Sequence, residues 1–203
     1  MSRYDASIDA ILDIEINNII AVKKTLDRGT MEKVIELLLR VKPEGRKVVT
    51  AGCGTSGTLA ERVAHSLCVA EVPATFLAPG NSVHGGLGLI QRGDVVILFS
   101  KGGNTLEILN YIPCCKSKGA TIIGVTQNDA SVLAREADIY FKILCEHESD
   151  MFDMCASASC NTIAAVWDAV IFTIMKHNGY TREDLMRIHP GGKVGELLKG
   201  KEN

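Results

Sequence analysis

Apolar residues in this chain fall into short runs that alternate with longer stretches of helical spacing. The runs are rich in Val, Ile, Leu, Thr and Phe and show no clear alternation with polar residues, so we expect strands that are buried on both faces. The pattern predicts an α/β fold: a five-stranded parallel sheet with helices on both faces, in a three-layer sandwich. The predicted strands are 47–51, 74–78, 94–99, 121–126 and 139–144, and the predicted helices around them are 57–70, 104–118, 130–136, 156–177 and 182–188.

Two further helices, within residues 5–42, are predicted before the first strand. The second spans about 31–41, and the first spans 5–27 with apolar residues at helical spacing. The pair either covers one face of the sheet or extends to a partner chain. No linker or repeat divides the chain, so residues 1–203 are expected to form one domain. The apolar residues of the first helix are Ile8, Ile11, Leu12, Ile16, Ile19 and Ile20, and those of the helix at 156–177 are Ile163, Val166, Trp167, Val170, Ile171 and Ile174.

Composition excludes several classes of function. The net charge of -2 gives no attraction to nucleic acid. The N-terminus shows no signal-peptide pattern, and the apolar stretches are interrupted before the ~18 residues of a membrane span, so no membrane partner is expected. The seven cysteines include no C-x-x-C pair. We therefore expect no zinc site, but mostly buried, reduced thiols in a cytoplasmic protein.

Two turns rich in glycine and hydroxyl groups carry the candidate chemistry. Each follows a predicted strand and precedes a predicted helix, where free backbone N–H groups and hydroxyls suit an anion. The carboxyl ends of parallel strands meet at one edge of a sheet, so both turns are expected to hold one phosphorylated ligand. The proposed phosphate-binding residues are Gly54, Thr55 and Ser56 in the first turn, and Ser100, Lys101, Gly102, Gly103, Asn104 and Thr105 in the second.

Other interpretations of the first turn are weaker. Gly52, Gly54 and Gly57 match G-x-G-x-x-G, but a dinucleotide site also needs an acidic residue after the second strand. Residues 76–80, FLAPG, contain none. A nucleotide P-loop would need Gly-Lys-Ser/Thr, which is absent. The glycines alone could simply permit a tight turn. The hydroxyl groups in both turns favour phosphate over that simpler explanation.

The second turn, with Leu106 and Glu107, resembles the Ser-x-Ser-Gly-x-Ser/Thr-x-x-Glu loop of the SIS (sugar isomerase) domain family. Residues 79–88, PGNSVHGGLG, look like the P-G-x-x-x-H-G-D-L-G segment of arabinose 5-phosphate isomerases. Residues 188–192 with Gly195 look like their S-H-P-G-G-x-x-G segment. The similarity covers about residues 10–198 and implies a flavodoxin-like SIS fold. Many such isomerases carry CBS repeats after this domain, and the printed chain has none.

The resemblance implies a 1,2-aldose–ketose isomerisation of a sugar phosphate through an enediol. That reaction needs an acid and a base but no cofactor or metal. His84 and His189 match histidines of the family segments. Glu148 aligns with an active-site glutamate of the family, with Glu146 as a possible substitute. These relations make His84, Glu148 and His189 the candidate catalytic residues, and the family matches at the turns are Ser56, Ser100 and Thr105.

Three positions depart from the family pattern. Thr55 stands where arabinose 5-phosphate isomerases carry a lysine, Gly102 replaces a serine, and Asn104 replaces a glutamate. Two interpretations therefore stay open: an isomerase, or a non-catalytic phosphosugar-binding or regulatory module. Hexulose 6-phosphate isomerisation is a weaker third. By resemblance we also expect a homotetramer or homodimer with active sites near subunit interfaces, where a histidine of one chain, such as His65, His84 or His189, acts in a neighbour's site.

Overall fold

A five-stranded parallel sheet forms the centre of the computed structural model, which describes residues 3–199. The strand order is β2-β1-β3-β4-β5, and every neighbouring pair is parallel. The predicted fold class is confirmed, and each predicted strand is present, although the second and fifth are shorter than expected. The strands are β1 (Val48–Gly52), β2 (Ala74–Phe76), β3 (Val95–Phe99), β4 (Thr121–Thr126) and β5 (Ile139–Lys142).

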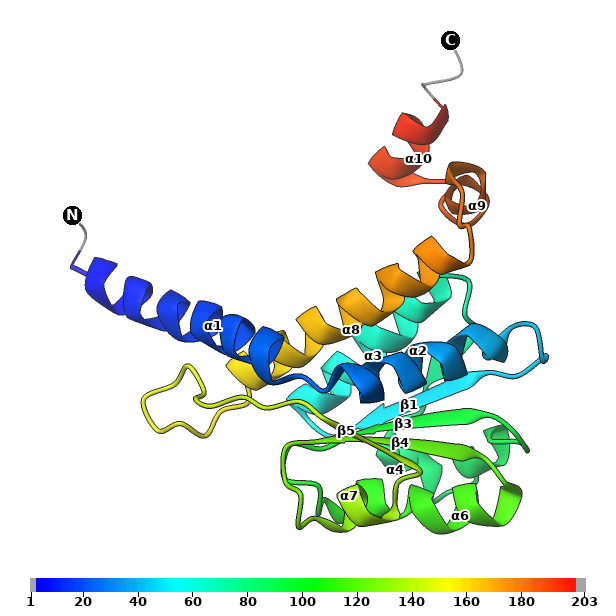
Figure 1. The fold of residues 1–203 in the computed structure, drawn as a ribbon, viewed down its shortest axis with the longest axis horizontal. Coiled ribbons are helices and arrows are strands. Elements are labelled where there is room, and N and C mark those ends of the chain that lie inside the picture. Colours follow the sequence, from blue (N-terminus) through cyan, green and yellow to red (C-terminus); the bar gives the residue numbers. More distant parts are fainter. Residues whose placement is uncertain (1–2, 200–203) are drawn as a thin grey trace.

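Helices cover both faces of this sheet (Figure 1). One face packs against α2 (Arg28–Val41), α3 (Thr55–Val69) and α8 (Ala158–His177), and the other against α5 (Leu106–Leu109), α6 (Tyr111–Lys118) and α7 (Val132–Glu136). Successive residues of β3 enter opposite cores: Val95 and Ile97 face the first set, whereas Val96 and Leu98 face the second. Because both faces are covered, the strands need no polar side, which explains why they show no alternation.

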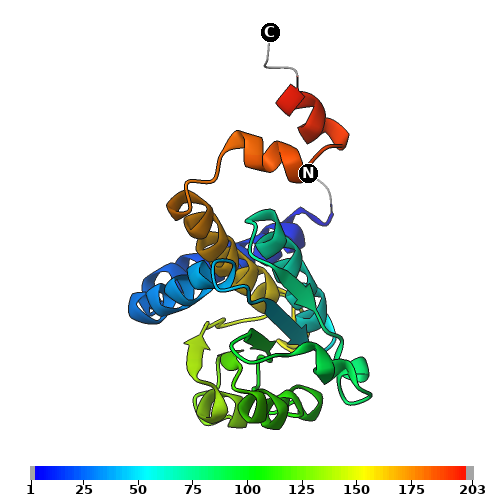
Figure 2. The same ribbon diagram turned by 90° about the vertical axis from the view of Figure 1, so that its right-hand side faces the viewer.

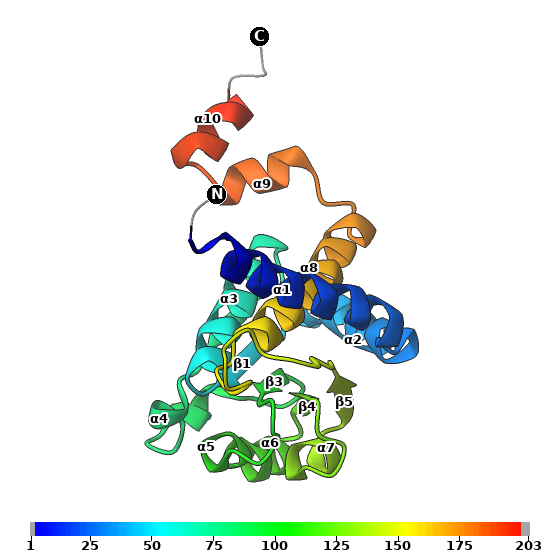
Figure 3. The ribbon, with the colours of Figure 1, turned by 90° about the vertical axis from the view of Figure 1, so that its left-hand side faces the viewer.

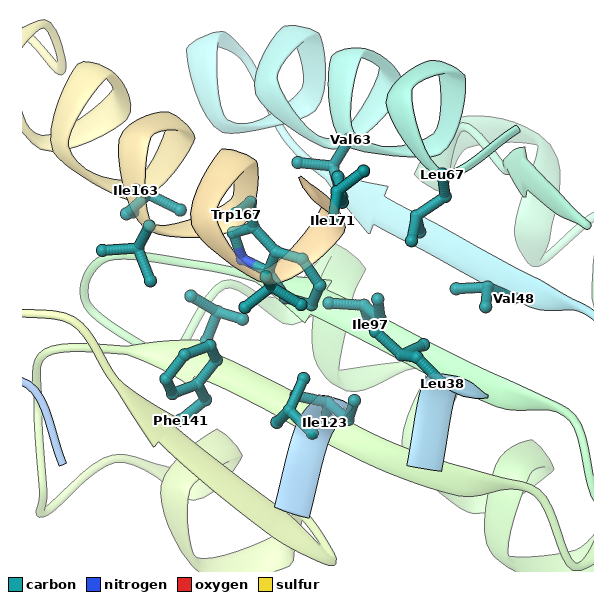
Figure 4. Packing of buried hydrophobic residues seen from close by; sticks show 14 of the residues in the cluster. Leu38, Val48, Val63, Leu67, Ile97, Ile123, Phe141, Ile163, Trp167 and Ile171 are labelled. Atoms are coloured by element: carbon teal, nitrogen blue, oxygen red, sulfur yellow. The ribbon is translucent and has the colours of Figure 1, made fainter. Parts of the chain in front are cut away.

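The larger core centres on Trp167 of α8. Its ring meets Phe99 of β3 and Phe141 of β5 edge-on, at centroid distances of 5.8 and 6.0 Å. Figure 4 shows Trp167 and Phe141 between α8 and the sheet. Such edge-to-face pairs add to the hydrophobic gain of burial. All six apolar residues predicted for this helix are buried: Ile163, Val166, Trp167, Val170, Ile171 and Ile174.

The helix predicted over 104–118 is divided in two. Residues 100–105 form a turn, α5 ends at Leu109, and α6 begins at Tyr111. A continuous helix would place Pro113 in its interior, where the ring would meet the carbonyl of Leu109 and no N–H could be donated to it. The break puts Pro113 in the first turn of α6, where proline is tolerated. Two short helices not predicted, α4 (Pro79–Ser82) and η1 (Gly86–Leu89), follow β2.

The N-terminal helix α1 (Asp5–Thr25) lies outside α8 and extends away from the sheet (Figure 3). Within it only Asn18 and Val22 are buried. Of the two predicted helices, α2 therefore covers the sheet and α1 does not. The apolar stripe of α1 stays 41–53% exposed, and comprises Ile8, Ile11, Leu12, Ile16, Ile19 and Ile20.

The helix α8 has the length and composition of a membrane span, which corrects the expectation that every apolar stretch is interrupted earlier. Half of its most apolar window is buried inside the fold, where it packs against α1, α2 and α3. Core helices of this kind have the same composition as membrane spans, so α8 is weak evidence for a membrane. Beyond its C-terminus, α9 (Arg182–Ile188) and α10 (Gly192–Lys199) project from the body (Figures 1 and 2).

The seven cysteines all have free thiols. The expectation of mostly buried thiols holds for three of them, Cys115, Cys145 and Cys160, while the other four are half-buried or exposed. Within residues 3–199, no group of three or more His, Cys, Asp or Glu side chains is arranged to hold a metal ion.

Candidate functional site

The first glycine turn joins β1 directly to α3. Gly54 has φ 55° and ψ −132°, a conformation that glycine adopts far more readily than other residues. A Cβ on Gly52 would lie 2.3 Å from the carbonyl oxygen of Ser56, so the helix starts in close contact with the strand end. No side chain caps the N-terminus of α3. The backbone N–H groups near Thr55 and Ser56 are therefore available to an anion at the edge of the sheet.

The second turn is held by its own hydroxyl groups. The Oγ of buried Ser100 lies 2.9 Å from Oγ1 of Thr105 and accepts the N–H of Gly103 at 3.1 Å. Gly103 has φ +69°, and a Cβ there would lie 2.2 Å from Oγ of Ser131. The position therefore requires glycine. Because Gly52 of β1 pairs in register with Phe99 of β3, the two turns begin level with each other.

Polar groups from the segment after β4 support the back of the second turn. The Asn104 Oδ1 accepts the N–H of Val132 at 2.9 Å, at the start of α7. The carbonyl oxygen of Gly102 accepts Nδ2 of Asn128 at 3.1 Å. These contacts tie the turn to β4 and α7 and use the amide oxygen of Asn104 for structure.

A partly buried ion pair connects the second turn to the loop that precedes α8. The Nζ of Lys101 lies 2.6 Å from Oε1 of Glu148. The side chain of Glu148 has no exposed surface, whereas that of Lys101 is 32% exposed. Glu148 also accepts the hydroxyl of Ser159 and the backbone N–H groups of Ser157 and Ser159, at 2.9 and 3.0 Å for the two N–H groups. Glu148 therefore holds the first turn of α8 together with the lysine.

These donors determine the charge of Glu148. Burial alone would raise the pKa of the carboxyl group, but the hydrogen bonds from Lys101, Ser159 and Ser157 outweigh burial and lower the pKa to about 2. The group is therefore a carboxylate at neutral pH. Glu146, the possible substitute, has an exposed side chain, so it is Glu148 that the structure places against the second turn.

The loop that carries Glu148 is fixed to α1. The side chain of Asn18 donates to the carbonyl of His147 and accepts the N–H of Glu146, both at 2.8 Å. Farther along the loop, the carboxylate of Asp150 accepts the backbone N–H groups of Phe152, Met154 and Cys155. The loop is therefore ordered by its own polar groups and by a helix distant in sequence.

The two candidate histidines lie on different parts of the molecule. His84 is exposed and lies between α4 and η1, and α4 contacts α5, which begins directly after the second turn. His189 follows α9, beyond the end of α8 opposite to Glu148 (Figure 1). The 20 residues of α8 span about 30 Å. The structure thus brings together the two turns, Lys101 and Glu148, but His189 lies remote from the site of its own chain.

Comparison with known proteins identifies the family. Residues 44–181 match the family model of the SIS domain. This chain belongs to the SIS domain family. Its curated relatives include the arabinose 5-phosphate isomerase KpsF of Escherichia coli, which is 31% identical over 177 residues; the match covers 87% of this chain and 55% of KpsF. The chain spans about half the length of the curated relatives it matches.

Two solved structures show the same fold at higher coverage. A Listeria monocytogenes protein is 43% identical with a TM-score of 0.90, and the match covers 94% of this chain and 100% of that one. An Escherichia coli CFT073 protein in complex with arabinose 5-phosphate is 30% identical with a TM-score of 0.87, at the same coverage. These matches confirm the resemblance to SIS domains, and to those of arabinose 5-phosphate isomerases in particular, that the sequence motifs indicated.

Two residues of the candidate site were not singled out from the sequence. Ser157 and Ser159 bind Glu148 at the start of α8. Ser157 directly precedes α8 and Ser159 lies in its first turn, and Ser157 makes no side-chain capping bond to the helix. Their carboxylate partner, however, could be found only by knowing how the loop after β5 folds back.

Proposed function

We propose that this SIS domain is a phosphosugar isomerase that interconverts an aldose phosphate and a ketose phosphate through an enediol, with a substrate like arabinose 5-phosphate. The observation that carries the proposal is the pair of level turns at the sheet edge with a Lys–Glu pair beside them. The name of the relative KpsF and the arabinose 5-phosphate bound in the E. coli structure support the same substrate class. The reaction requires no metal, cofactor, nucleic acid or membrane.

The proposed phosphate clamp consists of the two turns. Gly54, Thr55 and Ser56 would present N–H and hydroxyl groups from the start of α3, and residues 100–105 would do so from the start of α5. Such a clamp holds the reacting carbons in place without taking part in the proton transfer. His84 and His189 are proposed as acid and base, because imidazole titrates near neutral pH. Glu148 is the third candidate ionisable group.

The same proposal includes an assembly of chains. His189 lies beyond the far end of α8, so a neighbouring chain would bring it to this site. The exposed apolar stripe of α1 offers a surface for such contact. A homotetramer or homodimer with sites near its interfaces fits both features. A cytoplasmic location, inferred from free thiols, remains a prediction.

One experiment distinguishes an isomerase from a non-catalytic binding module. The alternative is favoured by Thr55, which stands where arabinose 5-phosphate isomerases carry an active-site lysine. The protein is incubated in deuterated water with arabinose 5-phosphate, ribulose 5-phosphate and a panel of hexose phosphates, and label uptake at C1 or C2 is followed by NMR. Uptake above a protein-free control supports the isomerase. If no sugar phosphate exchanges but one of them raises the melting temperature, the chain is a binding module.

A further inference from the structure

We propose that Lys101 is the cation that contacts the reacting oxygens of the sugar, and that Glu148 acts through it as a positioning residue. The inference rests on the proposed isomerase function. It differs from a simple phosphate clamp, because Lys101 would stabilise the negative charge that forms during isomerisation. It also removes Glu148 from direct proton transfer.

The position of the Lys101 ammonium is fixed at both ends. Its backbone carbonyl accepts Oγ1 of Thr126 at 2.8 Å and the N–H of Gln127 at 3.3 Å, so β4 holds the main chain. Its Nζ is held by Glu148 at 2.6 Å. An ammonium has three N–H donors. Among residues 3–199, Glu148 is the one residue to which the Lys101 ammonium donates a hydrogen bond. The side chain is 32% exposed, so the remaining donors can meet a ligand.

Glu148 itself is out of reach of a substrate. Its side chain has no exposed surface. Oε1 accepts from Lys101 and from the Ser159 hydroxyl, and Oε2 accepts the N–H groups of Ser157 and Ser159. A general base must come within hydrogen-bond reach of the proton that it removes. Glu148 could do so only by giving up the contacts that hold the start of α8.

The Lys101 ammonium balances the negative charge of the Glu148 carboxylate, and the other groups around that carboxylate do not. The thiols of Cys145 and Cys160 face it, and burial and then the charge of Glu148 raise the pKa of both thiols. Asp153 adds a second carboxylate nearby, because its Oδ1 accepts the backbone N–H of Glu148. Without Lys101, this acidic cluster would hold a buried, unpaired carboxylate, which is strongly unfavourable.

The isomerisation creates a charge that an ammonium can stabilise. A base removes the proton from C2 of the aldose, the C–H electron pair forms the C1–C2 double bond, and the carbonyl oxygen at C1 becomes negative. Protonation of that oxygen, loss of the hydroxyl proton at C2 and return of a proton to C1 complete the ketose. A fixed ammonium beside these oxygens stabilises the charged intermediate more than the neutral substrate, while Lys101 neither gains nor loses a proton.

The test compares four variants of the full chain: Lys101→Met, Lys101→Arg, Glu148→Gln and the double variant Lys101→Met/Glu148→Gln. Isomerisation of arabinose 5-phosphate gives kcat and KM, and calorimetry gives the affinity for inorganic phosphate. Lys101→Met is expected to lower kcat by about 100-fold and to change phosphate affinity by less than about threefold. Lys101→Arg, which keeps the charge, should fall between wild type and Lys101→Met.

The double variant distinguishes chemistry from structure. It replaces the ion pair by a neutral pair of similar size, so a purely structural lysine predicts recovery of kcat, whereas the proposal predicts that kcat stays low. If Lys101→Met does not fold, Glu148→Gln, which retains the lysine, should exceed the double variant in kcat by about tenfold or more. Three outcomes would overturn the proposal. One is recovery of kcat in the double variant. The others concern Lys101→Met: a kcat near that of wild type, or weaker phosphate binding at unchanged kcat. If wild type promotes label uptake into none of the sugar phosphates, the proposed isomerase function fails as well. If wild type and Lys101→Met are equally active, only the inference about Lys101 fails.

Discussion

The hydroxyl oxygens of Ser100 and Thr105 lie 2.9 Å apart across the turn after β3. Ser100 also accepts the N–H of Gly103, so its hydroxyl organises the turn proposed to bind phosphate. Ser100→Ala should weaken the binding of inorganic phosphate by about 1–2 kcal/mol, the contribution of one charge-assisted hydrogen bond, as measured by calorimetry. Ser117→Ala, which removes an exposed hydroxyl in α6, is the matched control. Equal affinity in wild type and Ser100→Ala would exclude the second turn from the site.

Asn104 links the second turn to α7 through its amide oxygen. Asn104→Ala should lower the free energy of unfolding by about 1 kcal/mol, because the N–H of Val132 loses its acceptor. Asn104→Asp keeps an acceptor and should keep the stability, but it places a negative charge near the bound phosphate and should weaken binding. Urea unfolding and calorimetry measure the two effects. A large loss of phosphate affinity in the alanine variant without a loss of stability would show instead that Asn104 contacts the ligand.

The buried Glu148 carboxylate makes stability depend on acid pH. Its pKa in the folded protein is about 2, below its ordinary value of 4.5, so the folded state binds this proton less readily than the unfolded chain. The stabilisation is fully present above pH 4.5 and is lost as the pH falls toward 2. It amounts to about 3 kcal/mol at most. Hydrogen bonds also lower the pKa of several aspartates, among them Asp27, Asp129 and Asp150. The measurement is therefore the difference in unfolding free energy between wild type and Glu148→Gln, which should shrink with falling pH. A constant difference contradicts the prediction.

The remote position of His189 predicts that two variants of lowered activity complement each other. In mixed oligomers of His189→Ala and Glu148→Gln, some sites combine an intact His189 from one chain with an intact Glu148 from another. With random mixing, about one site in four regains both groups if each site is built from two chains. Activity of the co-refolded mixture is compared with that of each variant alone. No recovery in a mixture shown to contain hybrid oligomers would place both residues in a site of one chain.

The apolar stripe of α1 predicts an oligomer that charge can dissociate. Replacing Leu12 and Ile16, which are 52% and 53% exposed, by lysine should lower the sedimentation coefficient to that of a monomer while circular dichroism stays unchanged. Asn17→Lys adds charge to the same helix at an exposed polar position and serves as the control. A wild type that sediments as a monomer at all concentrations would refute the proposed assembly.

Much of the fold could be predicted because each element carries a local signal. The unalternating strand runs indicated burial on both faces, and Val95 to Leu98 indeed enter two cores. The spacing around Trp167 identified the core helix. Pro113 was also a local signal for a helix boundary. The apolar residues at helical spacing on both sides of it nevertheless predicted one continuous helix, so the end of α5 was not predicted.

The site could be predicted only in part, since its decisive contact is not local. The two turns were visible because glycines and hydroxyl groups follow strands. Lys101 and Glu148, however, are 47 residues apart, and they meet because the loop after β5 folds back to the start of α8. No spacing in the sequence indicates that fold-back, so the contact between the lysine of the second turn and the carboxylate of a distant loop is visible only in the structure.

The level ends of β1 and β3 have a consequence for the kinetics of binding. Both turns are anchored by backbone packing and internal hydrogen bonds, at Gly52 in the first turn and at Ser100 and Gly103 in the second. A ligand that bridges them therefore finds its donors already in place and orders no segment of these turns on arrival. Association should then follow a single exponential whose rate rises linearly with ligand concentration, without the plateau that a slow rearrangement would impose.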